Sequence, residues 1–373
     1  MKLILRCTPM QQRLGYVNGL ITLTSTESFM SRERLGEMLL KCVEDKQEKW
    51  LKGARSSTGK ITKGKVNDII DWATGEKSLR LLFPTTLTWR PEARLLNCLI
   101  SDEEYYAFHS TSNYNPLILS MPERLFYLYK MLKIDGAALV YLMSNLGIEK
   151  TWTRKEAAIL LSNIYREYGK FCLSSAETTA DYLSSRKFIE VAERMNKSTR
   201  TRQGTVGTKE LRVTTRLEVL VDLEIIDKPK NKKDSYIYCR NQITPRFIEK
   251  FNDWMEDEKN LDEKFFERCA YIYNLKAKPA NNEEIFWSLI ANFRHLEAAY
   301  GLAGIDEVCL LSGIKLLSSK IPKILEINRA KTVLIEKQKE YQRDIKLHVN
   351  SRGRIRYFSV SEKLLNSIPS NYQ

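Results

Sequence analysis

Apolar residues recur at helical spacing along most of this chain, and short alternating segments follow several of the helical stretches. In 151–246, the Thr-x-x-Glu sequence at Thr153–Glu156 is typical of a capped helix start, and apolar positions then recur every three or four residues. Helices are therefore predicted from about 153, over 177–195 and over 209–222. Glu224–Asp227 and Ser235–Arg240 then predict two strands of a hairpin, joined by a turn that contains four lysines.

A related pattern occurs earlier in the chain. The segment 52–65 carries five basic residues and no acidic one, and the spacing in 66–73 predicts a short helix. Leu79–Phe83 and Leu87–Trp89 predict a second hairpin. A closing helix is predicted from Pro91, since proline suits the first turn of a helix.

The third instance lies at the C-terminal end. The apolar spacing in 321–341 predicts a long helix, and 344–349 then alternates strictly. A turn that ends in Gly353 leads to a return strand over 354–360, so a hairpin is predicted. Lys346 and His348 would share one side of this hairpin, and Arg354 and Arg356 would also share a side.

Helices followed by a hairpin with a basic tip resemble the winged helix-turn-helix superfamily. This resemblance is carried mainly by 151–246. It implies that the last helix before the hairpin lies in the major groove of DNA and that the hairpin, or wing, contacts the backbone or the minor groove. The layout of several such modules is similar to the recognition half of type IIS restriction enzymes.

We therefore predict a mainly α fold with short β-hairpins (α+β), in which two or three winged-helix-like units are joined by a helical spacer. The predicted regions are an N-terminal unit at 1–115, a central unit at 116–246, an acidic helical spacer at 247–300 and a C-terminal unit at 301–373. No sequence repeat or low-complexity tract accompanies them.

Charge supports a nucleic-acid partner. The chain carries 60 lysine and arginine residues against 46 aspartate and glutamate residues, a net charge of +14. This excess favours an anionic partner, most often nucleic acid. Residues 245–300 are acidic, with 11 acidic and 8 basic residues, whereas 301–373 holds 13 basic and 7 acidic residues. The acidic region thus separates two basic ones.

Several classes of protein are disfavoured. The longest apolar run, Ala137–Met143, is far shorter than the roughly 20 residues that span a bilayer, and the N-terminus does not resemble a secretory signal. The seven cysteines are scattered and form no C-x-x-C pair, which is typical of reduced thiols. We expect a cytoplasmic protein without a membrane partner.

The search for catalytic chemistry finds no complete motif. Gly59–Lys65 fits G-x-x-x-x-G-K, but Val66 stands where the magnesium-binding hydroxyl would be, so a basic loop is favoured. The three histidines are far apart in the sequence and predict no zinc site. Asp344 and Lys346 match the D-x-K end of a metal-dependent nuclease, without the second acidic strand that this chemistry needs. We predict no catalytic residue, no cofactor and no metal.

The favoured function is non-catalytic binding of nucleic acid, most simply duplex DNA. We further predict a DNA-recognition subunit of a bacterial restriction or anti-phage (antiviral defence) system, whose nuclease or ATPase is a separate chain. The candidate DNA-binding residues are Lys60, Lys63, Lys65, Arg200, Arg202, Lys209, Arg212, Arg216, Lys228, Lys230, Lys232, Lys233, Lys346, Arg352, Arg354 and Arg356.

Three alternatives stay open. A plasmid or phage replication initiator would also pair winged helices and should prefer direct repeats from its own replicon. An adaptor would bind proteins through the acidic middle of the chain. A cryptic metal-dependent nuclease would assemble its carboxylates from distant positions.

Overall fold

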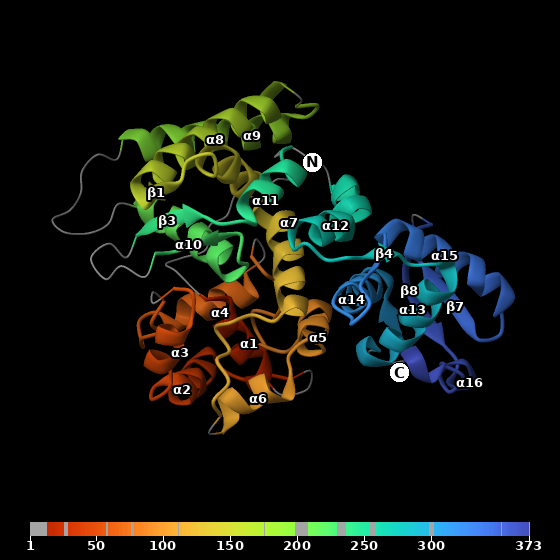
Figure 1. Ribbon diagram of the computed structural model, residues 1–373. Helices are drawn as coiled ribbons and strands as arrows, with labels where there is room; N and C mark the ends of the chain where they lie inside the picture. Colours follow the sequence, from red (N-terminus) through yellow and green to blue (C-terminus); the bar gives the residue numbers. More distant parts are fainter. Residues whose placement is uncertain are drawn as a thin grey trace.

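The structure is a computed structural model (Figure 1). It describes residues 13–25, 29–56, 59–75, 78–110, 112–174, 176–197, 208–229, 236–253, 258–297, 302–351 and 353–372. These residues form a mainly helical protein with short strands in small sheets, which confirms the α+β expectation. Their buried hydrophobic side chains make one continuous core.

The N-terminal unit, 13–119, is built around a helix that is buried at all ten of its positions. This helix is α1 (Leu14–Leu23), whose sequence is apolar on most sides, as expected for a helix enclosed by others. It contacts α2, α4, α5 and α6. The remaining helices of the unit are α2 (Arg32–Val43), α3 (Gln47–Gly53), α4 (Val66–Thr74), α5 (Pro91–Asn97) and α6 (Asp102–His109).

The predicted hairpin of this unit is minimal. Leu82 and Trp89 form a single antiparallel bridge. The backbone N–H of Trp89 also donates to the carbonyl of Ser25, and that of Met30 donates to the carbonyl of Thr86. Ser25 and Met30, which both lie between α1 and α2, are therefore hydrogen-bonded to the hairpin. Helices α4 and α5 begin at Val66 and Pro91, as predicted.

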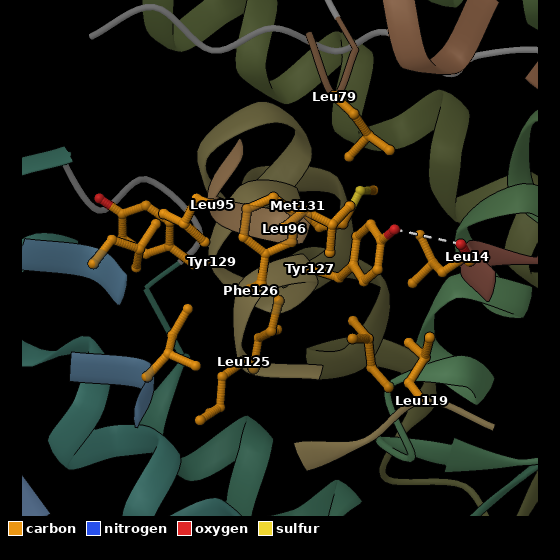
Figure 2. Packing of buried hydrophobic residues seen from close by; sticks show 14 of the residues in the cluster. Leu14, Leu79, Leu95, Leu96, Leu119, Leu125, Phe126, Tyr127, Tyr129 and Met131 are labelled. Carbon is orange, nitrogen blue, oxygen red and sulfur yellow. Dashed lines mark hydrogen bonds between the residues drawn. The ribbon is translucent and has the colours of Figure 1, made fainter. Parts of the chain in front are cut away.

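A long helix, α7 (Met121–Leu146), connects the N-terminal unit to the rest of the molecule (Figure 1). It begins with a capping box between Ser120 and Glu123. In Figure 2 Tyr127 lies toward Leu14, to whose carbonyl its hydroxyl donates, and Phe126 and Met131 lie among the other buried side chains of the cluster. The aromatic residues of this stretch are therefore core residues, as the sequence favours.

The middle unit, 121–251, adds a three-stranded antiparallel sheet to α7. Its elements are β1 (Thr151–Thr153), α8 (Arg154–Ser174), α9 (Thr179–Lys197), α10 (Thr208–Asp222), β2 (Ile226–Asp227), β3 (Ile237–Arg240) and α11 (Thr244–Lys250). The strand order is β1-β3-β2, with Trp152 opposite Tyr238 and Ile226 opposite Arg240. The predicted helices and both hairpin strands are thus present.

The C-terminal unit, 258–372, contains two small sheets. Its elements are α12 (Glu258–Ile272), β4 (Lys278–Pro279), α13 (Asn282–Leu296), β5 (Ala303–Gly304), α14 (Ile305–Leu317), β6 (Lys323–Ile324), α15 (Ile327–Glu340), β7 (Ile345–Val349), β8 (Ile355–Val360), α16 (Glu362–Leu365) and a 3₁₀ turn (Ser370–Tyr372). Strands β4 and β6 pair in parallel, and the antiparallel sheet has the order β5-β8-β7. The β7–β8 hairpin is confirmed.

The middle and C-terminal units share one order of elements. In each, a helix leads to a short strand, helices follow, and a hairpin returns so that its second strand pairs with the first short strand. The middle unit has the additional helix α9, which packs against α8, and the C-terminal unit has the additional strand β6 between α14 and α15. The two units thus share a topology without evident sequence similarity.

Two expected boundaries are corrected. The long helix predicted over 321–341 begins at Ile327, because Lys323 and Ile324 form strand β6. The segment 247–300 is helical, as predicted, but its last helix, α13, packs against α14 and α15. This helix buries Phe286, Leu289 and Phe293, so it shares a core with the C-terminal elements.

Two expectations concern the surroundings of the protein. Among the described helices, none combines the length and the apolar character needed to cross a bilayer. Cys42, Cys98, Cys172, Cys239, Cys269 and Cys309 are free thiols, and Cys7 lies outside the described residues.

Candidate nucleic-acid interface

Helix α10, expected to lie in a DNA groove, is enclosed by the protein over its second half. Every residue from Val213 to Leu223 is buried. Arg216 is 1% exposed, and its Nε and Nη2 donate to Asp135 at 2.5 and 3.0 Å. The prediction that Arg216 contacts DNA is therefore wrong: its guanidinium joins α10 to α7 at the residue where α7 departs from helical geometry.

The prediction that Lys228 contacts DNA is also wrong. Its Nζ lies 2.6 Å from Glu218 Oε1, and only 4% of the lysine side chain is exposed. The Tyr238 hydroxyl donates to the same carboxylate oxygen. Burial lowers the pKa of Lys228, although Glu218 opposes this effect. Burial alone would raise the pKa of Glu218, but Lys228 and Arg13 outweigh it, so the carboxylate stays ionised. This lysine completes an internal ion pair.

A third buried pair joins α10 to the N-terminal unit. Arg13 lies 2.5 Å from Asp222 at the end of α10, and the guanidinium also donates to the backbone carbonyls of Ser56 and Leu117. The Leu14 N–H donates to the second oxygen of Asp222. Because a buried charge must be paired, these contacts hold α10 and α1 in one arrangement.

The N-terminal basic loop is exposed but only partly available. Lys60 forms an ion pair of 2.9 Å with Glu48 that remains open to solvent. Lys63 is exposed, and Lys65 is half-buried at the start of α4. The helix that follows carries two aspartates, Asp68 and Asp71, and no basic residue. Helix α4 therefore brings no cation to a phosphate, in contrast to the loop that precedes it.

Several predicted residues lie beyond what the structure describes. Arg200, Arg202, Lys230, Lys232, Lys233 and Arg352 are outside the described residues. Lys209 and Arg212 lie within α10, but their side chains are not described. Their predicted contacts with DNA remain predictions.

The β7–β8 hairpin presents the clearest basic surface. Lys346, Arg354 and Arg356 are exposed, and the sequence 345–360 contains no acidic residue. Lys346 pairs with Ser359, and His348 pairs with Tyr357, so these four side chains share the outer face. Ile345 and Phe358 are buried on the inner face. The predicted alternation is thus confirmed, including the shared side of Lys346 and His348.

A bulge displaces one of the arginines. His348 faces Tyr357 and Val349 faces Ile355, so Arg356 is the additional residue between two successive pairs. Such a bulge bends a strand and redirects side chains. The turn is closed by Gly353, whose φ of 71° lies in the region that glycine adopts most easily.

Helix α15 lies directly before this hairpin and contacts β7. It buries Ile327, Ala330, Val333 and Leu334 and leaves the opposite face exposed. The exposed residues are Arg329, Thr332, Ile335, Glu336, Lys339 and Glu340. This exposed face carries two basic and two acidic side chains, and α10 has no such accessible face over its described side chains.

The alternative chemistries find little support in the described residues. The Asp344 carboxylate accepts a hydrogen bond from the Ser361 hydroxyl at 2.5 Å, and α15 precedes it where a nuclease would need a second acidic strand. Within the described part of the chain, no group of three or more His, Cys, Asp and Glu side chains is placed to hold a metal ion.

Sequence interpretation missed the partners of the buried charges. Asp135 interrupts an apolar stretch of α7, and Arg216 lies between Val213 and Leu217 on α10. A charge within an apolar stretch is a signal of internal pairing, because burial without a partner is costly. The identity of each partner depends on the packing of distant helices.

Comparisons with known proteins add no relative. No family model, no curated protein and no solved structure matches this chain.

Proposed function

We propose that this protein binds duplex DNA and that the C-terminal unit makes the principal contact. The observation that carries the proposal is the exposed basic hairpin β7–β8 beside the accessible helix α15. In a winged-helix module the corresponding helix enters the major groove and the hairpin contacts the backbone. The order of elements α13-β5-α14-β6-α15-β7-β8, with the sheet order β5-β8-β7, supports assigning the C-terminal unit to this class.

The same order supports a related origin for the middle unit, with a different role. Its hairpin follows α10, whose second half is fixed by buried ion pairs. We propose that the middle unit orients the molecule and that its undescribed basic segments add phosphate contacts. As a wider role, we propose a DNA-recognition subunit of a bacterial restriction or anti-phage system, with the nuclease or ATPase on a separate chain.

A salt titration tests the proposal. The full chain is titrated onto a short random duplex from low to moderate salt, and binding is followed by fluorescence anisotropy. Phosphate contacts release counterions, so log affinity should fall linearly with log salt, by about 0.9 for each phosphate neutralised. A slope of several units supports the proposal. No binding at low salt would contradict it and favour the adaptor, whereas cleavage with Mg²⁺ alone would favour the nuclease.

A further inference from the structure

The outer face of the β7–β8 hairpin carries two rings side by side. His348 and Tyr357 are directly opposed across the strands, and both are exposed, with 49% of Tyr357 accessible. On its other side Tyr357 faces Gly304 of β5, where the Glu307 carboxylate occupies the space that a side chain would fill. The exposed half of the tyrosine ring remains accessible at the surface of the sheet.

The hairpin that carries these two rings also carries exposed basic side chains. Lys346 lies on the same face two residues before His348, and Arg354 and Arg356 are exposed on the neighbouring strand. One acidic side chain, Glu307, lies on the β5 side of Tyr357, where its carboxylate occupies the space beside Gly304. The β7–β8 part of the face is thus basic and aromatic together.

Exposed rings together with cations fit an unpaired nucleotide better than they fit a paired duplex. In duplex DNA, each base is covered above and below by its neighbours, so its flat face cannot stack on a protein ring. An unpaired base exposes that face, and proteins that bind single strands combine aromatic rings for the bases with cations for the phosphates. Helix α15 carries no aromatic residue. Of these two elements, the hairpin is therefore the one that can stack an unpaired base.

We propose that the hairpin binds an unpaired nucleotide next to a duplex, with the base stacked on Tyr357 and the flanking phosphates near Lys346 and Arg354. His348 extends the stacking surface. This inference rests on the proposed function, since the duplex would be held by the rest of the C-terminal unit. It makes the protein a reader of DNA ends, gaps or melted sites in addition to duplex.

The test compares two DNA molecules that differ by one single-stranded tail. One is a short blunt duplex, and the other is the same duplex with a tail of either polarity and 2-aminopurine at its first unpaired position. Affinity is measured at one fixed salt concentration, and stacking is followed by quenching of the 2-aminopurine fluorescence. The variants are Tyr357→Ala, Tyr357→Phe and, as a matched control, Tyr106→Ala, since Tyr106 is 56% exposed in the N-terminal unit.

The wild-type protein should prefer at least one tailed duplex by about fivefold or more, the lower end of the effect of one stacked base. Tyr357→Ala should abolish this preference and the quenching while leaving blunt-duplex affinity within about twofold. Tyr357→Phe and Tyr106→Ala should retain both. Equal affinity for blunt and tailed DNA, or a preference that survives Tyr357→Ala, would overturn the inference but not the proposed function. If the wild-type protein binds neither blunt nor tailed duplex, both the inference and the proposed function are wrong.

Discussion

Helices α10 and α15 occupy the same position in their units, directly before a hairpin, yet their surroundings are opposite. Arg216 on α10 is buried against Asp135, whereas Arg329 on α15 is exposed and donates to the Asn282 side chain. The charge of a helix therefore does not reveal whether it faces a partner or the interior. The comparison moves the expected DNA contact from the middle unit to the C-terminal unit.

The largest expected effect follows from breaking the buried pair on α10. Arg216→Ala leaves the Asp135 carboxylate buried without its arginine, which should lower the free energy of unfolding by about 3–5 kcal/mol. Chemical denaturation measures this loss. Arg216→Met combined with Asp135→Leu should recover most of it, because no charge is then buried. A stable Arg216→Ala protein with weakened DNA binding would place Arg216 at the interface and break the comparison.

Charge reversal of the hairpin should have the next largest effect. A hydrogen bond to a charged group contributes about 1.5–3 kcal/mol, so Arg354→Glu with Arg356→Glu should reduce duplex affinity at least about tenfold. The salt slope should fall by about 2, one for each lost phosphate contact. Anisotropy titrations at several salt concentrations measure both quantities.

The matched control for the hairpin is Lys41→Glu with Lys49→Glu, which makes the same change in net charge at exposed positions of the N-terminal unit. It should change affinity and slope far less than the hairpin variant. Equal effects of the two variants would mean that only net charge matters.

The outer face of α15 should influence sequence preference. Arg329→Ala and Lys339→Ala remove exposed side chains from the helix that would enter the groove, and each base contact discriminates between bases by about 1–3 kcal/mol. A preferred site is first selected from random DNA, and affinities for that site and for random duplex are then compared. Loss of the difference supports base contact by α15, whereas a uniform decrease would assign these residues to phosphate contact.

The smallest effect concerns two neighbouring buried carboxylates, Glu104 and Glu123. Asn18 Nδ2 donates to Glu104 at 2.7 Å and to Glu123 at 2.6 Å. Burial and the neighbouring Glu123 raise the pKa of Glu104 well above its ordinary value of 4.5. The protonated form is thus favoured in the folded protein, and its stabilising contribution is lost as the pH rises from about 4.5 through the raised pKa.

Glu104→Gln should remove this pH dependence and stabilise the protein near neutral pH by about 1 kcal/mol, the value of one pKa unit. Thermal unfolding from pH 5 to 8 measures the change. Glu103→Gln, at an exposed position one residue earlier, should leave the pH profile unchanged. A steeper loss of stability with pH in Glu104→Gln would contradict the assignment.

Much of the local structure could be predicted from the sequence. The β7–β8 hairpin follows from strict alternation around a turn with Gly353, and α5 from the proline at its start. These signals act over a few residues. The burial of Arg216 and Lys228 could not be predicted, because each depends on a carboxylate from another part of the fold. Exposure of α15 depends in the same way on which helices cover it.

Hydrogen exchange with and without a short duplex tests the central claim most directly, because it reports every segment in one experiment. We expect new protection in 345–360 and in the outer face of α15, with no change in 213–222 of α10, whose buried backbone already exchanges slowly. Protection confined to 208–240, with none in the C-terminal hairpin, would contradict the account and return the DNA contact to the middle unit.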